Sequence, residues 1–555
     1  LINISEVEDG KHTYEWFLKD EIPTYLASVA VGEYALYESI YNGVERDIPI
    51  QVYVYPSHIN RVEGTLINFD SIVSIFETKF GPYPWERIGF VAVPFSSGAM
   101  EHATNIAMPS LIFTGDTSYE DLFAHEFAHH WFGDAITCST AQDMWINEGW
   151  ATYCESIYRE FLYGRENMIK YRRASHAKVV RYAHIEDDGF LELDNIPLDK
   201  TYCSTVYQKG AGLAHSLRTY LGDNMFFDAI TALVNHYKFK NLSTNDMKEF
   251  LSDYTGIELQ DWFDGWVSSP GFPHYAIDSV KITEEGENYE AKVYVKQKMR
   301  GRTNFVNSNK IPISFLNSQY QDTTVFVHFD GEFGEASFEL NEMPKFVFCD
   351  YHETMCDAKV SQSLWIKNTT INSPLNLYTR LKASNITADS LFVRVTHNWV
   401  APDSMKQKID GLFLADNRYW LIEGDFNENC DMKCEFQYGV LENASTNGYL
   451  DNEFINNSLD SVVLMYRPNK AADWQIIEHT NQTSTKRLVT ENLLPGEYAL
   501  GIWNWSTWVN NKVHETKNFN IFPNPSNNKA NIQFDKAMSG KIRVFNAAGS
   551  LISEF

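Results

Sequence analysis

The stretch HEFAHHWFGD, from His125 to Asp134, holds three histidines and a glutamate in a short and mostly apolar run. On an α-helix, residues four apart lie on one face, so His125 and His129 can present two ring nitrogens to one metal ion. Glu126 projects beside this pair and can reach a water on the metal without being a ligand. His130, next to His129, points away from that face and is expected to be a bystander.

The sequence NEGWATYCE offers a third ligand, because Glu148 opens the next predicted helix there. Zinc at a catalytic site takes three protein ligands and keeps one position open. Glu148 follows His129 by 19 residues, so an antiparallel pair of helices would bring its carboxylate to both histidines. Zinc bound by two histidines and one glutamate is typical of hydrolases, because the metal lowers the pKa of a bound water to about 7. A structural helix with buried histidines remains the alternative for the HExxH motif taken alone.

The composition of the 555-residue chain is that of a globular protein with three to four domains. Hydrophobic residues make up 44% of it, which is enough to bury several cores. The formal net charge of −27 makes nucleic acid or an anionic membrane surface an unexpected partner, because both require a basic face. No run approaches the ~18 apolar residues of a transmembrane segment. Since the chain starts at Leu1 without a methionine or a signal-like segment, we expect it to be a fragment.

Changes of pattern divide the chain into regions. Alternating apolar and polar residues from Tyr14 to Tyr37 predict strands. Helical periodicity extends from about residue 118 to 268, in segments such as DLFAHEFAHHWFG and NEGWATYCESIYREFLYG, and the run SSPGFPHY at 268–275 ends it. Short alternating strands then predict a β-sandwich, and a second strand-rich region follows at 364–515.

Three blocks of the sequence, in this order, resemble the gluzincin aminopeptidases of the aminopeptidase N type. The first is YPWERIGFVAVPFSSGAMEH, in which residues 98–101 match the family's GAMEN exopeptidase segment. The second is HEFAHHWFGD with Glu148, which 18 residues separate from His129, and the third is TYCSTVYQKGAG, which places Tyr207 at the family's catalytic tyrosine. Thermolysin-type endopeptidases share the two histidines and the glutamate, but they have one more residue before the third ligand and no GAMEN segment. The resemblance spans residues 14–339 and is strongest from 83 to 212.

This resemblance implies a catalytic zinc, one ion per chain, held by His125, His129 and Glu148. Glu126 is then the general base that acts on a zinc-bound water and passes the proton to the leaving amine. The hydroxyl of Tyr207 and the metal together polarise the scissile carbonyl.

The resemblance also implies a substrate-binding segment formed by Gly98, Ala99, Met100 and Glu101. Glu101 binds the free α-ammonium of the substrate, which restricts cleavage to the first residue. The backbone of Gly98 and Ala99 can lie along the substrate like an added strand. The chain departs from the family at His102, where the family has Asn. An imidazole, which titrates near neutral pH, therefore replaces the amide.

The implied fold is a multidomain α+β protein, with a thermolysin-like zinc catalytic domain (mixed sheet plus helical lobe) followed by β-sandwich domains. Only the last strands of the family's N-terminal β-saddle domain are represented, so we expect a chain that is truncated at its N-terminus. The predicted domains are 1–40 for the end of the β-saddle domain, 41–275 for the catalytic domain, 276–362 for a β-sandwich, 363–516 for a second sandwich-like domain and 517–555 for a partial sorting module.

The C-terminal segments FPNPS and IRVFNAAGSLI resemble the sorting module of type IX secretion in Bacteroidetes, which implies export to the cell surface or the medium. Two close cysteine pairs, Cys349 with Cys356 and Cys430 with Cys434, are compatible with disulfides in an oxidising compartment. For the other three cysteines, Cys138, Cys154 and Cys203, buried free thiols are the alternative.

The leading interpretation is a secreted zinc aminopeptidase that acts on peptides with a free N-terminus. One alternative is a gluzincin endopeptidase on the same metal. Another is a non-catalytic secreted binding protein with a vestigial zinc site. The sequence does not indicate the preferred first residue, the oligomeric state or the role of residues 363–516.

Overall fold

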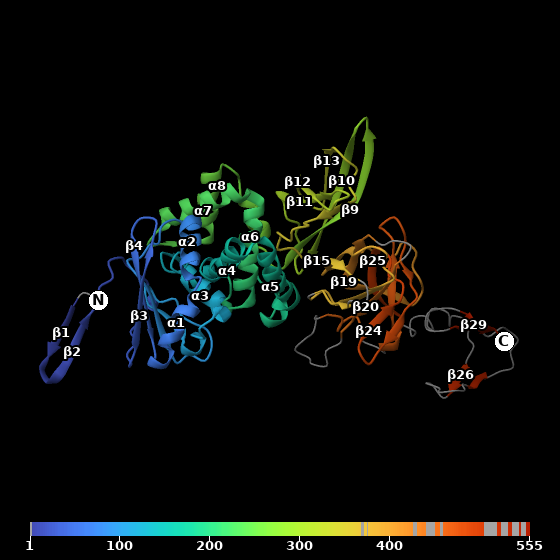
Figure 1. Cartoon of the computed structure of the whole chain (residues 1–555). Helices are drawn as coiled ribbons and strands as arrows, with labels where there is room; N and C mark the ends of the chain where they lie inside the picture. Colours follow the sequence, from blue (N-terminus) through green and yellow to red (C-terminus); the bar gives the residue numbers. More distant parts are fainter. Residues whose placement is uncertain are drawn as a thin grey trace. The chain divides into compact units, whose positions relative to one another are not determined.

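The chain folds into two compact units, each of which is described by itself. The computed structural model describes residues 3–367, 371–374, 376–425, 430–439, 450–455, 459–503, 519–522, 531–534, 543–545 and 551–554 (Figure 1). The first unit comprises Leu1–Val179, Glu186–Tyr275 and Ile282–Asp357, and the second comprises Val180–Ile185, Ala276–Lys281 and Ala358–Phe555.

The first unit contains a mixed four-stranded sheet with the strand order β3-β4-β5-β6. β3 runs antiparallel to β4, whereas β5 and β6 run parallel to it. Helix α2 connects β4 to β5, and the Phe69 ring of α2 packs on Phe90 of β5 and on Phe127 of α3. The bounds are β3 (Ala35–Asn42), β4 (Asp47–Val54), α1 (Val62–Thr65), α2 (Phe69–Phe80), β5 (Ile88–Val93) and β6 (Ile106–Pro109).

A helical lobe follows the sheet. Its elements are α3 (Glu120–Ala128), β7 (Ile136–Cys138), α4 (Glu148–Tyr163), α5 (Arg165–Glu186), α6 (Gly210–Leu221), α7 (Asp223–Tyr237), β8 (Lys240–Leu242), α8 (Thr244–Thr255) and α9 (Gln260–Trp266). α3 ends earlier than the predicted segment, because Trp131 N bonds to Ala128 O and tightens the chain into a turn. The Trp150 ring of α4 stacks between Phe132 and Phe226, so aromatic packing fixes α4 against the end of α3 and against α7.

The stretch from Tyr14 to Tyr37, predicted to form strands, does so only at its ends. β1 (Asn3–Val7) and β2 (Lys11–Glu15) form a hairpin. Between β2 and β3, the described chain contains a 3-10 turn at Thr24–Leu26 and no strand. A strand needs a hydrogen-bonded neighbour, and the side chains of Val29 and Val31 are 87% and 92% exposed. Alternation alone therefore mispredicted this stretch.

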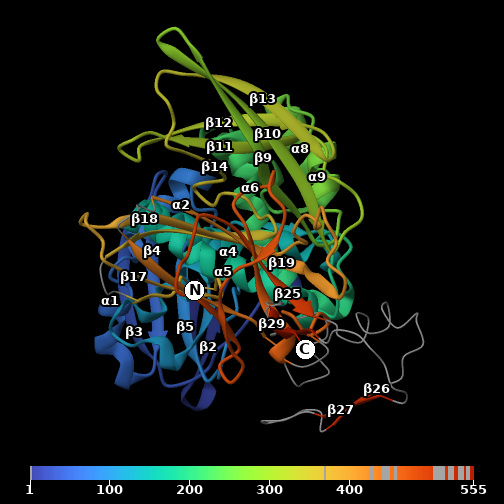
Figure 2. The same cartoon turned by 90° about the vertical axis from the view of Figure 1, so that its right-hand side faces the viewer.

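Two antiparallel three-stranded sheets, with the orders β13-β10-β9 and β12-β11-β14, follow the helical lobe in the sequence (Figure 2). Rings from the two sheets meet: Phe315 contacts Phe338, and Tyr275 contacts Phe329. Aromatic side chains of the two sheets are therefore in contact, and the β-sandwich stays a prediction. The bounds are β9 (Phe272–Glu285), β10 (Asn288–Arg300), β11 (Asn309–Leu316), β12 (Asp322–Phe329), β13 (Phe333–Leu340) and β14 (Phe346–Cys349).

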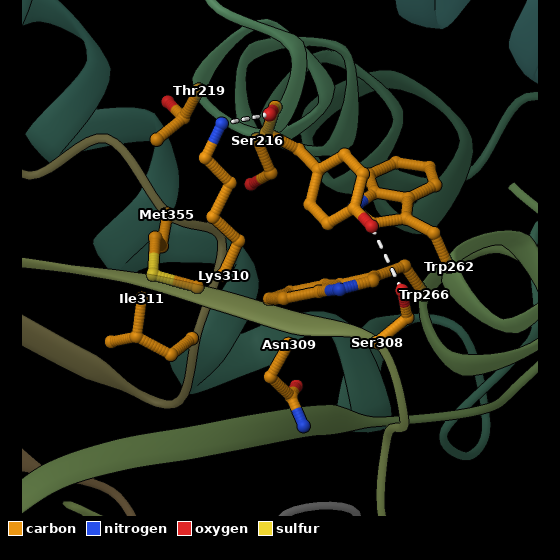
Figure 3. A pocket seen from close by; sticks show the side chains of 10 residues that line it. Ser216, Thr219, Trp262, Trp266, Ser308, Asn309, Lys310, Ile311 and Met355 are labelled. Atoms are coloured by element: carbon orange, nitrogen blue, oxygen red, sulfur yellow. Dashed lines mark hydrogen bonds between the residues drawn. The ribbon is translucent and has the colours of Figure 1, made fainter. Parts of the chain in front are cut away.

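Polar contacts attach these sheets to the helical lobe within the first unit (Figure 3). The hydroxyls of Tyr220 and Ser308 lie 2.8 Å apart, and Lys310 Nζ donates to the Tyr220 carbonyl at 2.7 Å. The small cavity between them, which Trp262 and Trp266 also line, measures about 10 Å³. Such a volume holds about one water molecule, so the junction is closely packed.

The described part of the second unit includes a six-stranded and a five-stranded antiparallel sheet, with the orders β15-β18-β19-β25-β21-β22 and β16-β17-β20-β24-β23. The Phe436 ring of β20 lies between Trp420 of β19 and Tyr498 of β25, which joins the two sheets through an aromatic core. The bounds are β15 (Lys359–Ile366), β16 (Ile371–Asn372), β17 (Thr379–Ser384), β18 (Leu391–Asn398), β19 (Leu412–Gly424), β20 (Asp431–Gln437), β21 (Val462–Arg467), β22 (Gln475–Ile476), β23 (Thr480–Gln482), β24 (Arg487–Thr490) and β25 (Gly496–Trp503).

The predicted sorting module at 517–555 lies mostly outside the described residues. Four short strands are described there: β26 (Phe519–Phe522), β27 (Asn531–Phe534), β28 (Arg543–Phe545) and β29 (Leu551–Glu554). The five predicted domain ranges stay predictions.

All seven cysteines belong to the described part of the chain and are free there, so neither close pair forms the disulfide that its spacing suggested. No helix within the described ranges is both long and apolar enough to cross a membrane.

Candidate active site

Every residue that the sequence predicts for the site lies on the wall of one cavity of about 560 Å³ in the first unit. Its histidines come from the end of α3, Glu148 is the first residue of α4, and Tyr207 precedes α6. The predicted exopeptidase segment lies in the loop between β5 and β6. The lining residues are Gly98, Ala99, Met100, Glu101, Asp121, Leu122, His125, Glu126, His129, Glu148, Glu155, Tyr202 and Tyr207.

His125, His129 and Glu148 form a group with the spacing of metal ligands. Their closest atoms are the two histidine Nε2 atoms, 3.2 Å apart, and Glu148 Oε2, which lies 3.4 Å from His125 Nε2 and 3.3 Å from His129 Nε2. Ligands at about 2.0–2.2 Å from a tetrahedral zinc ion lie roughly 3.3–3.6 Å from one another. The three residues therefore fit a zinc ion, and together they form a group that could hold a metal.

Nδ1 of each histidine forms a hydrogen bond, which leaves Nε2 to face the metal position. His125 Nδ1 donates to Glu155 Oε1 at 2.7 Å, and His129 Nδ1 donates to the carbonyl of Phe132 at 2.9 Å. The hydroxyl of Tyr171 in turn donates to Glu155 Oε2. Hydrogen bonds of this kind fix the tautomer and the orientation of metal-binding imidazoles.

When no metal is bound, the positive charges of the two imidazoles and the negative charges of the nearby carboxylates stabilise one another. Burial lowers the pKa of His129, but the carboxylates of Glu101 and Glu148 outweigh it and raise that pKa to about 9. Burial also lowers the pKa of His125, while Glu148 and Glu155 hold it well above its usual value. Burial raises the pKa of Glu148, and the two imidazoles more than reverse this effect. Because metal ligands must be deprotonated, metal uptake here displaces protons from the imidazoles.

Glu126 lies beside the metal group with the properties of a proton acceptor. Its side chain lines the cavity and is 5% exposed. Burial raises the pKa of Glu126 to about 7. A carboxylate with a pKa near 7 can take up a proton and return it at neutral pH.

Tyr207 lies in a π-helical turn, Thr205–Lys209, directly before α6. Single π-turns within helices frequently mark functional sites. Its ring is nearly parallel to that of His125, with centroids 6.2 Å apart. Burial and the nearby carboxylate of Glu148 raise the pKa of the Tyr207 hydroxyl. The hydroxyl therefore keeps its proton and can donate a hydrogen bond to an oxygen in the cavity.

The predicted exopeptidase segment is fastened to β6. Met100 N donates to Ala107 O at 3.0 Å, and Ala107 N donates back to Met100 O at 2.8 Å. Gly98 has a φ of 69°, a conformation that residues with a Cβ rarely adopt. The turn at Gly98 and the bridge at Met100 together fix the position of Glu101, whose side chain is 8% exposed and lines the cavity.

The 3-10 turn at Thr24–Leu26 contacts both this segment and the metal helices. Leu26 O accepts a hydrogen bond from Ala103 N at 3.2 Å. The Tyr25 hydroxyl donates to Gly133 O at 3.5 Å and accepts from Asn147 Nδ2 at 3.4 Å. Since Asn147 directly precedes the ligand Glu148, the turn connects the exopeptidase segment with the start of α4.

His102 and His130 lie outside the metal group. His102 is partly buried, and burial lowers its pKa although the nearby Glu101 acts in the opposite direction. The ring of His130 is completely buried, and its Nδ1 lies 2.8 Å from the hydroxyl of Tyr83. His130 thus faces the core.

The sequence analysis did not identify Glu155, Tyr171 or Tyr202 as part of the site. Glu155 lies seven residues after Glu148, two turns along the same helix face, so its spacing was a usable signal. Tyr202 belongs to the block TYCSTVYQKGAG, five residues before Tyr207. Tyr171 lies on α5 and had no sequence signal, because only the packing of α5 against α4 brings it to Glu155.

Comparison with known proteins identifies two matched regions. Residues 66–266 match the model of the peptidase family M1 domain, and residues 520–554 match that of a secretion system C-terminal sorting domain. Aminopeptidase 2 of Candida albicans is 29% identical over 287 residues, which are 49% of this chain and 30% of that protein. Aminopeptidase N of Streptomyces lividans is 27% identical over 302 residues, 49% of this chain and 34% of that protein. The chain thus spans about a third of the length of these relatives.

A solved structure, that of Legionella pneumophila aminopeptidase A in complex with aspartic acid, has a similar fold. It superposes with a TM-score of 0.52 and 19% sequence identity over 64% of this chain and 42% of that chain. The metal group and Tyr207 both lie inside the region that matches the family model. Residues 66–266 of this chain are therefore similar to the peptidase family M1 domain.

Proposed function

We propose that the chain is a zinc-dependent aminopeptidase that removes the N-terminal residue from peptides. One observation carries the proposal: the carboxylate of Glu101 shares the cavity with the metal group, and it lies with Glu126 and His129 in a cluster of ligand atoms less than 4.8 Å across. A negative charge this close to the metal can hold an α-ammonium only when the first peptide bond lies at the reaction centre.

His125, His129 and Glu148 would hold the zinc ion. When bound, zinc supplies a Lewis acid that polarises the scissile carbonyl and makes water a better nucleophile. The family match and the ligand spacing support one such ion at these residues.

The remaining roles belong to side chains of this chain. Glu126 accepts a proton from the attacking water and returns it to the leaving amine. The hydroxyl of Tyr207 donates a hydrogen bond to the carbonyl oxygen as negative charge develops there. Gly98 and Ala99, held in place by the bridge at Met100, lie along the backbone of the substrate.

The test compares alanine p-nitroanilide with its N-acetylated form, on the wild-type chain and on Glu101→Gln. The account predicts hydrolysis of the free amine only, and a fall in kcat/KM of at least tenfold in the variant, because a charge-assisted contact is lost. Equal hydrolysis of both forms would indicate an endopeptidase instead. No hydrolysis of either form by the zinc-loaded chain would favour a non-catalytic binding protein.

We also propose export to the cell surface or the medium through type IX secretion, which the match of residues 520–554 to a sorting domain supports. A carrier protein fused to residues 517–555 should reach the surface or the medium in a host that has this system. The same fusion should remain inside cells of that host in which the system has been deleted. Retention in both hosts would refute the assignment.

A further inference from the structure

A second cluster of metal-ligating side chains shares His129 with the first. Glu101, Glu126 and His129 each offer one ligand atom, and these atoms lie within 4.8 Å of one another. The two carboxylates are 8% and 5% exposed, and both line the cavity. In the part of the chain that the structure describes, neither carboxylate has a hydrogen bond or an ion pair.

Buried carboxylates without a partner are costly when charged, so a cation from solution that pairs with Glu101 and Glu126 stabilises their charged forms. The α-ammonium of a substrate is one such partner. A divalent cation is another, because carboxylate oxygens are good ligands for dications and two of them nearly neutralise the charge of the ion.

The two clusters cannot both use His129 Nε2. When an ion is bound by His125, His129 and Glu148, a second ion keeps only the two carboxylates and solvent as ligands. The shared histidine places the second position directly beside the first. Ions in two-metal sites lie about 3.5–4 Å apart, so two adjacent positions of this kind can be occupied together.

We propose that Glu101 and Glu126 bind a second divalent cation, and that this ion inhibits the enzyme reversibly. The inhibition rests on the proposed function, whereas the binding does not. With the second ion in place, Glu126 cannot accept a proton and Glu101 cannot hold the α-ammonium. The second ion and the substrate amine therefore compete for the same carboxylates. With two protein ligands instead of three, the second ion binds more weakly than the first.

The first experiment measures zinc binding by equilibrium dialysis, with no substrate present. Wild-type protein should bind one zinc tightly and a second one at a higher free zinc concentration. Glu101→Gln and Glu126→Gln should each keep the tight ion, which also shows that they are folded, and lose the weaker one. Glu86→Gln, an exposed carboxylate outside the cavity, serves as the matched control and should keep both. A single ion at every zinc concentration, or a second ion retained in both cavity variants, would overturn the proposal.

The second experiment measures hydrolysis of alanine p-nitroanilide by the wild-type protein at increasing free zinc. Activity should rise to a maximum with the first ion and fall at least tenfold as the second one binds. Raising the substrate concentration should restore activity. Inhibition that substrate does not relieve would contradict competition for Glu101 and Glu126. If two ions bound but no peptidase activity were found, the second binding site would be supported and only the proposed function would be refuted.

Discussion

The Nδ1 atom of His125 lies 2.7 Å from Oε1 of Glu155, while Nε2 of the same ring faces Glu148 and His129. A carboxylate behind an imidazole orients the ring and makes it a stronger ligand. Glu155→Gln keeps the shape but removes the charge, so it should weaken zinc binding by about 10–100-fold. Competition with a chelator of known affinity measures this change.

Glu166→Gln, an exposed carboxylate on α5, is the control for that substitution and should bind zinc like the wild type. Tyr171→Phe removes the hydrogen bond to Glu155 and should have a smaller effect of the same sign. If Glu155→Gln bound zinc as tightly as Glu166→Gln, Glu155 would have no role in positioning His125.

Tyr207→Phe should lower kcat by about 10²–10³-fold and leave KM nearly unchanged. The hydroxyl acts on the negative charge that develops in the transition state, so its loss affects the chemical step more than substrate binding. Steady-state kinetics on alanine p-nitroanilide separates the two constants. Tyr254→Phe, at an exposed tyrosine of α8, should leave both constants unchanged. A higher KM with unchanged kcat in Tyr207→Phe would assign the hydroxyl to substrate binding instead.

Tyr25→Phe tests whether the turn at Thr24–Leu26 positions the exopeptidase segment. The substitution removes two long hydrogen bonds, to Gly133 and Asn147, which together are worth about 1 kcal/mol. We expect KM for a free-amine substrate to rise about 2–10-fold, with an unchanged zinc content. Tyr14→Phe, at an exposed tyrosine of β2, is the control. A loss of zinc in Tyr25→Phe would mean that the tyrosine supports the metal ligands rather than the substrate segment.

Lys209 gives the first unit a pH-dependent stability. Its Nζ donates to the carbonyls of Leu191 and Ser269, and its side chain is 2% exposed. Burial lowers the pKa of Lys209 from 10.5 to about 8. The folded environment therefore disfavours the charged form of this side chain by about 3 kcal/mol. Between pH 8 and 10.5 the unfolded chain binds more protons at this lysine than the folded chain does. The contribution of Lys209 to the free energy of unfolding therefore increases as pH rises through that window.

Urea unfolding of the wild type and of Lys209→Met measures this effect. The difference in unfolding free energy, wild type minus variant, should increase by about 3 kcal/mol from pH 7.5 to 10.5. Groups that the two proteins share cancel in this difference. A difference that stays constant with pH would show that Lys209 is charged in the folded state over the whole range.

The metal group could be predicted from sequence because its geometry is mostly local. Helical spacing alone places His125 and His129 on one face, and Glu148 opens the helix that packs on theirs. The same local logic would have found Glu155, two turns after Glu148. Tyr25 could not be found in this way, because its hydroxyl meets residues 108 and 122 positions further along the chain.

Two features of the fold depended on tertiary structure. Residues 165–186 form α5 inside the predicted helical region, although their many charged side chains give no clear apolar stripe. Residues 16–34 alternate like a strand, yet without a pairing partner they form only a 3-10 turn. Sequence periodicity predicts a helix or strand reliably when the apolar face that it indicates is buried in the folded protein.

The most direct test of the account is to measure zinc content and hydrolysis of leucine and alanine p-nitroanilides for the wild-type chain and for Glu126→Gln. Both proteins are first dialysed to remove loosely bound metal. The account predicts one zinc ion in each protein, hydrolysis by the wild type, and a loss of about 10²–10⁴-fold in the variant. Undiminished hydrolysis by Glu126→Gln would contradict the assignment of Glu126 as the general base.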